Sequence, residues 1–418
     1  MQNEDIVAAI ETKLTAVGVQ DVVEPEEVRP AAFLSKDRKA IIDLEEELQK
    51  SLDTLKTDER LPRLLFGLAN LHLKEANFSR AIVLYEVTLG MSSRQVNAWL
   101  NMGTAYLLAG EAKDAVSCFS SALAIEPDNA RGLTKLATAQ LEMNDLESCL
   151  SSLERALEID STLLKAMVVK GRYFAKKGDL TGATTWFNKA LRIDPMFLPA
   201  LTELGQIYVS NGRYDSAAEV LDRALRIDPE HPYALALLGD TFFARRDYEK
   251  ALSFYDRALN VKFDDPHLWI KKADSHRMLR SYKEAVAAYE KAINANPENA
   301  EAWSKCGQVL VLSNEVPAAL EYFNTALALF PDSADTAHQR GLVYYSLGKL
   351  EEALADFDLA FSSEPGNPVH LYYRGLVLEK LNRKPEAKRT WQIAASLYRE
   401  AGDSTKAAEC SARMKRMS

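Results

Sequence analysis

The stretch VNAWLNMGTAYLLAGEAKDAVSCFSSALAIEPDN, residues 96–129, decides the fold of this chain. In its first half, Trp99, Met102, Gly103 and Tyr106 are spaced at i, i+3, i+4 and i+7, so they lie on one face of a helix. Gly110 interrupts this stripe, and a second helical stripe then runs until Pro127, whose ring ends a helix. The stretch therefore predicts two helices joined by a turn, each with an apolar face that a single hairpin cannot bury.

The same 34-residue pattern continues in both directions without insertion or deletion. It predicts ten units in one register, which begin at Pro62, Val96, Ala130, Leu164, Leu198, Pro232, Pro266, Ala300, Ala334 and Pro368. Position 8 of each unit is glycine or alanine, and position 24 is always a large apolar or aromatic residue. Position 20 is alanine except at Cys149, and position 27 is alanine except at Thr88. Small residues let two helices approach closely and large ones fill the space between hairpins, so we expect an all-α stack of hairpins.

This pattern resembles the tetratricopeptide repeat (TPR), a family of helix–turn–helix units with a W…LG…Y…A…F…A…P signature. The resemblance covers residues 62–401. It implies a right-handed superhelical solenoid of ten 34-residue units with capping helices at both ends. It is specific to the fold and not to one function, because this architecture serves many unrelated binding tasks.

The N-terminal segment, residues 1–35, stands outside the repeats. The pattern of residues 3–17 predicts a short amphipathic helix with an apolar stripe on one side, and residues 18–35 contain two prolines and an acidic run typical of an extended linker. Three roles are possible for this apolar stripe. It extends the cap of the first unit, or it is disordered. In the third case it acts as a self-ligand or as a handle for a second chain, while the linker passes the cations of units three and four.

Two further segments flank the repeats as predicted caps. Residues 36–61 hold a helix without the core residues of a repeat, and its simplest role is to cover the first unit. Residues 402–418 predict a C-terminal helix over residues 405–417, with basic side chains near its end, where the helix dipole favours cations.

Composition and charge disfavour several classes of protein. The formal net charge is −9, and residues 1–61 carry −7 of it, so the chain lacks the basic surface that nucleic-acid binding needs. The N-terminus has no secretory-signal pattern and no stretch is apolar enough for a membrane span. The cysteines have no zinc or disulfide spacing, which is typical of buried thiols in a reducing compartment. We therefore expect a soluble, cytoplasmic protein.

No motif for catalysis, a metal or a cofactor rises above chance, so we expect a protein that is not an enzyme. His72 and His276 occupy position 11, a core position, and are expected to be packed histidines. The tryptophans Trp99, Trp269 and Trp303 occupy position 4, which is also expected to be core, with Trp303 fully buried.

The resemblance implies that the first helix of each unit lines a concave groove through positions 2, 5, 6, 9, 12 and 13. These positions are expected to be free, because the core uses positions 4, 7, 8 and 11. Near the start of the array they include Asn70 and Asn101. Five cations follow over units three and four: Arg131, Lys135, Lys165, Arg172 and Lys176. Further along, the groove positions turn aromatic: Tyr233, Phe243, Tyr345, Tyr372 and Tyr373.

One comparison within the family concerns members that hold a C-terminal carboxylate of a chaperone in a clamp of lysine, arginine and asparagine. The matching places in units one to three read Phe66, Asn70, Asn101, Arg131 and Lys135. Four of them are compatible, with the two basic types exchanged, but Phe66 replaces the lysine that would meet the carboxylate. Three interpretations are open: a clamp, a broader acidic-peptide site over units one to four, or a solvated basic face.

We therefore expect a non-catalytic scaffold or adaptor that binds a peptide or protein segment in its groove. The expected partner is a protein, with an acidic segment or a C-terminal carboxylate as candidates. The alternative is a structural subunit that self-associates or builds into a larger assembly.

Overall fold

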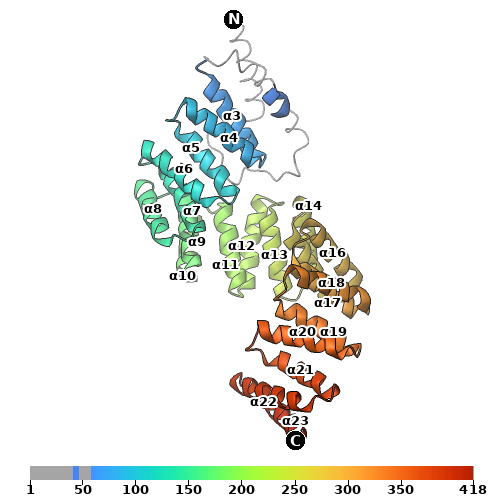
Figure 1. The fold of residues 1–418 in the computed structure, drawn as a ribbon. Helices are drawn as coiled ribbons and strands as arrows, with labels where there is room; N and C mark the ends of the chain where they lie inside the picture. The colour runs from blue at the N-terminus through green and yellow to red at the C-terminus, as the bar shows by residue number, and fades with distance from the viewer. Residues whose placement is uncertain (1–40, 47–57, 418) are drawn as a thin grey trace. The chain divides into compact units, whose positions relative to one another are not determined.

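Paired helices joined by short turns build the protein, and the computed structural model describes residues 41–46 and 58–417 (Figure 1). The described residues contain no strand. The chain consists of two compact units, Met1–Ile207 and Tyr208–Ser418, which we call unit A and unit B.

In unit A the helices follow one another in antiparallel pairs. They are α3 (Leu61–Lys74), α4 (Phe78–Met91), α5 (Val96–Leu108), α6 (Ala112–Ile125), α7 (Ala130–Glu142), α8 (Leu146–Ile159), α9 (Leu164–Lys176) and α10 (Leu180–Ile193). Helix α11 (Leu198–Ser210) begins in unit A and ends in unit B.

Unit B continues with α12 (Tyr214–Ile227), α13 (Pro232–Ala244), α14 (Tyr248–Val261), α15 (Pro266–Met278), α16 (Tyr282–Ala295), α17 (Ala300–Leu312), α18 (Val316–Leu329), α19 (Ala334–Ser346), α20 (Leu350–Ser363), α21 (Pro368–Lys380), α22 (Lys384–Glu400) and α23 (Ser404–Arg416).

The predicted helical hairpins are confirmed. The first helix of each predicted repeat begins at its predicted residue, apart from α3, which begins one residue earlier, at Leu61. The right-handed superhelix, the count of ten repeats and the domain boundaries stay predictions.

Fixed residues of the repeat start and stop the helices. Several first helices begin at an Asn, Asp or Ser cap, as where the side chain of Asn129 accepts from the N–H of Gly132 at 2.8 Å. After each first helix, the residue at position 15 of the repeat has a positive φ. Four repeats have glycine there: Gly110, Gly178, Gly212 and Gly348. The other residues at this position are Ala76, Asn144, Arg246, Arg280, Asn314 and Asn382. This left-handed residue ends the helix and turns the chain into the second one.

Positions 8 and 24 form the centre of each hairpin. A Cβ built on Gly171 would lie 2.4 Å from Cε1 of Phe187, and one on Gly239 would lie 2.3 Å from Cε1 of Tyr255. Phe187 is fully buried. The small residue is therefore needed because the ring of the second helix lies directly against the first helix.

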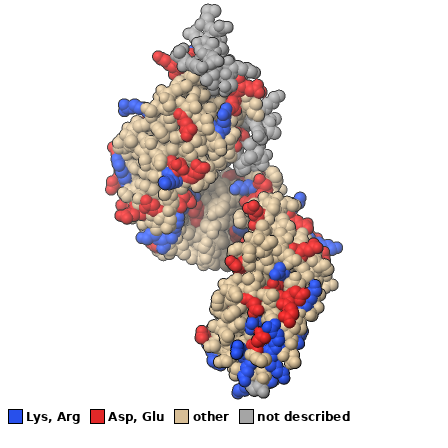
Figure 2. Space-filling view, viewed as in Figure 1, with Lys and Arg blue, Asp and Glu red and all other residues tan. Residues whose placement is uncertain are grey.

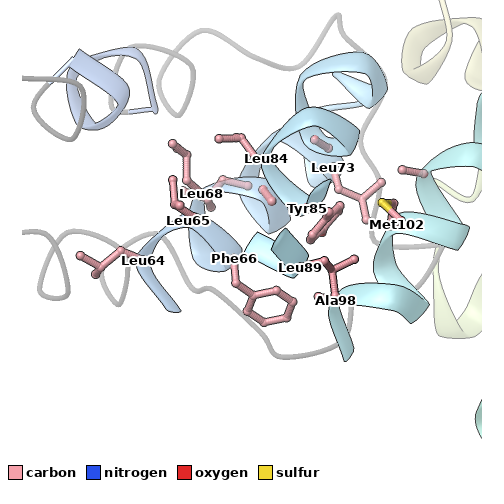
Figure 3. Packing of buried hydrophobic residues seen from close by; sticks show 14 of the residues in the cluster. Leu64, Leu65, Phe66, Leu68, Leu73, Leu84, Tyr85, Leu89, Ala98 and Met102 are labelled. Carbon is pink, nitrogen blue, oxygen red and sulfur yellow. The ribbon is translucent and has the colours of Figure 1, made fainter. Parts of the chain in front are cut away.

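Residues 41–46 lie within the predicted N-terminal capping helix and are helical. Ile41 and Leu44 are buried, in one apolar cluster with residues of α3, α4 and α5. Figure 3 shows part of this cluster, where Tyr85 lies near Leu73 and Leu89. The predicted helix over residues 3–17 and the linker over residues 18–35 lie outside the described residues.

At the other end, α23 packs against α22. This helix begins at Ser404, one residue before the predicted start at 405, and the side chain of its cap, Asp403, accepts from the N–H of Lys406. Ala407 and Cys410 are buried in one cluster with Trp391, so this helix covers the last hairpin as expected.

The predicted full burial of Trp303 is wrong. Trp99, Trp269 and Trp303 are all partly buried, and each indole N–H donates to the backbone carbonyl six residues earlier, at 2.7 to 2.9 Å. Position 4 therefore lies at the edge of the core, because the indole must reach the turn that precedes its own helix.

Candidate functional site

At several steps of the array, a hydrogen bond joins position 9 of one repeat to position 6 of the next, 31 residues later. We call each such pair a rung. The rungs are Asn70–Asn101 at 2.8 Å, Thr104–Lys135 at 3.1 Å, Arg172–Glu203 at 2.7 Å, Asp240–Lys271 at 2.7 Å and Asp274–Lys305 at 2.9 Å. Each joins the first helices of two successive repeats.

These rungs correct the expectation that positions 6 and 9 are free. Where position 24 is tyrosine, its hydroxyl donates to the position 9 side chain, as from Tyr85 to Asn70 at 2.6 Å and from Tyr255 to Asp240 at 2.8 Å. Position 9 therefore ties the hairpin core to the next repeat. The spacing of complementary side chains 31 residues apart was the signal in the sequence for these pairs.

A cavity of about 600 Å³ lies in unit A where the series of rungs is interrupted. Position 9 is Thr138 there, and position 6 of the next repeat is the apolar Val169, so no rung forms between them. The Thr104–Lys135 rung lies before the gap and the Arg172–Glu203 rung after it. We call this cavity the basic pocket, and its size is in the range of ligand-binding pockets.

The basic pocket combines charged, hydroxyl and apolar side chains. Its charged residues are Lys135, Glu142, Lys165 and Arg172, and its threonines are Thr104, Thr134 and Thr138. Its apolar wall includes Leu107, Leu108, Phe119, Val168, Val169 and Phe197. Helices α5, α6, α7, α9 and α11 and the turns beside them supply these residues.

The structure thus brings three of the five predicted groove cations into one cavity. Lys135 is almost buried, with 9% of it exposed, and donates to the hydroxyl of Thr104. Arg172 is exposed and forms an ion pair with Glu203. Of the other two cations, neither of which lines the cavity, Arg131 is exposed and Lys176 donates to the backbone carbonyl of Leu141 at 2.5 Å.

The threonines of the pocket have a fixed orientation. The hydroxyl of Thr134 donates to the carbonyl of Ala130 at 2.8 Å, and that of Thr138 donates to the carbonyl of Thr134 at 2.9 Å. A hydroxyl that donates in this way keeps lone pairs for accepting. The pocket therefore offers acceptors for peptide N–H groups beside donors for carboxylates.

The residues at the proposed clamp positions are used inside unit A. Phe66 is buried in the cluster of α3 and α4, 6.1 Å from the ring of Tyr85. Asn70 and Asn101 are both 0% exposed, and the amide of Asn101 donates to Asn70. This bond crosses the interface between two repeats, which is a structural use of the two asparagines.

The predicted aromatic groove residues lie in unit B, and their side chains have different surroundings. Tyr233 is 44% exposed, whereas Phe243 packs edge-on against Tyr248 at 5.3 Å. The ammonium of Lys380 lies 3.9 Å from the ring centre of Tyr345.

The side chains of Tyr372 and Tyr373 contact residues of other helices. The hydroxyl of Tyr372 donates to Glu409 of the C-terminal helix α23 at 2.6 Å, and Lys406 of that helix lies 4.3 Å from its ring centre. Tyr373 stacks on Phe357 and lies edge-on to His338. Tyr372 therefore holds the cap, a role that its groove position in the repeat did not indicate.

His338 and His370 form a buried pair that the sequence did not indicate. Their Nδ1 atoms lie 3.1 Å apart, so one ring donates to the other, and Nε2 of His370 lies 3.4 Å from Glu364. Burial and the adjacent His370 lower the pKa of His338 to about 4. The pair is thus held with His338 neutral at ordinary pH.

The other titratable candidates are structural. His72 is buried and His276 is partly buried, and burial lowers the pKa of each. All four cysteines are buried free thiols. Burial raises the pKa of Cys118 and Cys306 to about 12, which disfavours the reactive thiolate. In residues 41–46 and 58–417, no three His, Cys, Asp or Glu side chains gather as metal ligands.

Two further properties concern the described chain as a whole. On the face shown in Figure 2, acidic and basic side chains are interspersed within each unit. No helix in the described part of the chain is both long and apolar enough to cross a bilayer.

Comparison with protein families gives matches over most of the repeats. One model described as tetratricopeptide repeat matches residues 66–130, 202–266, 270–334 and 338–392. Two others with the same description match residues 106–167 and 164–195. No curated protein matches the chain.

Solved structures with a similar fold share little sequence with this chain. PilF of Pseudomonas aeruginosa is 20% identical, with 53% of this chain and 96% of that chain covered, at a TM-score of 0.45. MamA is 24% identical, with 41% and 94% covered, at a TM-score of 0.38. Yeast Tom70 is 15% identical, with 86% and 92% covered, at a TM-score of 0.42.

Proposed function

This chain belongs to the tetratricopeptide repeat family, and we propose that it is a non-catalytic adaptor that binds an acidic, extended protein segment in the basic pocket. The family supports a protein-interaction scaffold in general. The observation that carries the specific proposal is the convergence of Lys135, Lys165 and Arg172 on one cavity with apolar walls.

Each part of the pocket has a matching part in such a segment. The three cations are suited to carboxylates, because hydrogen bonds between charged partners are about twice as strong as neutral ones. The hydroxyl oxygens of Thr134 and Thr138 are suited to backbone N–H groups, and the side chains of Val168 and Phe197 to apolar residues between the acids. Glu142 disfavours a ligand that is acidic along its whole length.

The interrupted series of rungs makes room for the ligand. At the neighbouring steps, position 9 and position 6 are bonded to one another. At Thr138 and Val169 the same space is bounded by a hydroxyl and an apolar side chain. A segment that enters there does not have to break a rung, so its binding energy is not spent on separating two bonded side chains.

Fluorescence anisotropy with short synthetic peptides tests the proposal. The peptides alternate glutamate with valine or proline, and matched peptides carry lysine or glutamine in place of glutamate. We expect the acidic series to bind. The variant Lys165→Glu with Arg172→Glu should bind it at least about tenfold more weakly, because a charged hydrogen bond contributes about 1.5–3 kcal/mol. The remaining binding should depend less on salt.

A matched control carries the same change of charge in unit B. Lys283 and Lys291 are exposed on α16, and Lys283→Glu with Lys291→Glu should leave the affinity unchanged. Circular dichroism checks that both double variants are folded, since Arg172 also pairs with Glu203. Equal affinity of the acidic peptides for the wild type and the pocket variant would remove the basic pocket as the binding site.

A further inference from the structure

The basic pocket has a candidate occupant within the same chain. We propose that residues 19–30, with the sequence VQDVVEPEEVRP, bind in the basic pocket and compete with the partner segment. This inference rests on the proposed function, because it names a ligand for the same site. Residues 19–30 lie outside the described part of the structure, so their sequence is compared with the pocket.

Charge complementarity is the first step. The segment carries four carboxylates, at Asp21, Glu24, Glu26 and Glu27, and one cation, Arg29. The pocket carries three cations and one carboxylate, Glu142. Opposite charges attract one another more strongly where a cation such as Lys135 is nearly buried than at an open surface, because less water screens them.

The apolar residues of the segment alternate with its acids. Val22, Val23 and Val28 are interleaved with the carboxylates, and the prolines at 25 and 30 favour an extended backbone. An extended, proline-containing segment loses little conformational entropy when it binds a groove. Its valines match the apolar wall that Val168 and Phe197 provide.

A tether of thirteen residues joins Val28 of the segment to Ile41 of the N-terminal cap. Ile41 is buried in the cluster of α3, α4 and α5, and thirteen residues from Val28 to Ile41 span up to about 45 Å when extended. Helix α5, which forms the first wall of the pocket, packs directly on α3.

Tethering makes even a weak contact effective. A short linker holds the segment at an effective concentration of about 1 mM. With an intrinsic dissociation constant of about 0.1 mM, the tethered segment would occupy the pocket about nine-tenths of the time. A partner would then bind with about tenfold lower apparent affinity than it has for the empty pocket.

Hydrogen exchange of the full chain, followed by mass spectrometry, tests this occupancy. We expect the amides of residues 19–30 to exchange about tenfold more slowly than in the isolated peptide of the same sequence. Lys165→Glu with Arg172→Glu should abolish this protection, and adding Glu26→Lys with Glu27→Lys to that variant should restore it. Glu4→Lys with Asp5→Lys, the matched control in the same N-terminal segment, should leave it unchanged.

Affinity gives the second readout. Glu26→Lys with Glu27→Lys in the full chain should bind the acidic peptide probe about tenfold more tightly than the wild type, because the internal competitor is weakened. Protection that disappears on dilution would mean that another copy donates the segment, which contradicts binding within one chain.

The two proposals fail in different ways. If residues 19–30 exchange as fast as the free peptide, or if the pocket variant leaves their protection unchanged, this inference is wrong even when the pocket binds acidic peptides. If no variant binds any acidic peptide while the protection depends on Lys165 and Arg172, residues 19–30 bind the pocket as inferred, but the proposed partner function is wrong and the competition that depends on it is wrong as well.

Discussion

Gly171 and Phe187 illustrate how single residues set the distance between two helices. The Cε1 atom of Phe187 lies only 2.4 Å from the place where a Cβ of residue 171 would be. We predict that Gly171→Ala lowers the free energy of unfolding by about 1–3 kcal/mol, because the ring has to shift in a packed core. Urea denaturation measures it.

Gly90 provides the matched control for that change. It lies in α4, where a Cβ would meet no other atom within 4 Å, so Gly90→Ala should be neutral or stabilise by up to about 1 kcal/mol. Equal destabilisation by both substitutions would show that the close approach of Phe187 is not the cause.

The buried pair of His338 and His370 predicts a loss of stability in acid. The pKa of His338 is about 4 in the folded chain and 6.5 by its ordinary value, so the unfolded chain binds the proton first as pH falls. The contribution of His338 is therefore fully present above pH 6.5 and is lost between about 6.5 and 4, by up to about 3 kcal/mol. Asp335, which favours the charged form, opposes part of this effect.

Urea denaturation of the wild type and His338→Gln at several pH values between 4 and 7 tests this prediction. Glutamine keeps a hydrogen-bonding side chain but does not titrate in this range, so the variant should lose less stability than the wild type over the same interval. Parallel pH dependence of the two proteins would exclude His338 as the source.

At the scale of the element, the turn inside each hairpin requires a left-handed residue. Gly178 supplies it at φ +79° without a steric cost, whereas Arg246 adopts φ +64° with a Cβ. We predict that Arg246→Gly raises the free energy of unfolding by about 0.5–1 kcal/mol and that Gly178→Ala lowers it by a similar amount. Thermal unfolding monitored by circular dichroism measures both, and a destabilising Arg246→Gly would mean that the arginine side chain outweighs the backbone term.

At the scale of the whole molecule, the period of the sequence predicted the helices well. A single deletion would have shifted the register of every later repeat. Because the ten predicted repeats share one register, the sequence allowed only one consistent assignment of the residues at which the helices begin. The bounds of α5 and α6 follow from Gly110 and Pro127, because these residues act on the backbone itself. The edge position of Trp303 was missed because periodicity reports a face of the helix and not the depth of a side chain in the core.

The candidate site was only partly predictable. Spacing placed Lys135, Lys165 and Arg172 on neighbouring first helices, and the structure brings them to one cavity. The repeat pattern assigns groove positions one repeat at a time. Read in this way, it misses rungs such as Asp274–Lys305, although the two side chains lie 31 residues apart and are complementary, and it misses the pairing of Tyr372 with Glu409 of the cap.

The proposed function places an acidic segment in the basic pocket, between the Thr104–Lys135 and Arg172–Glu203 rungs. Replacing Thr138 with a photo-crosslinking phenylalanine analogue tests this placement, with the same replacement at Thr325, which is likewise partly buried and lies on α18, as the control. After irradiation with a labelled acidic peptide, mass spectrometry locates the attachment. The peptide should attach at position 138 and not at 325, and an excess of unlabelled acidic peptide should prevent the attachment. Binding of the peptide without attachment at 138, or equal attachment at both positions, would contradict it.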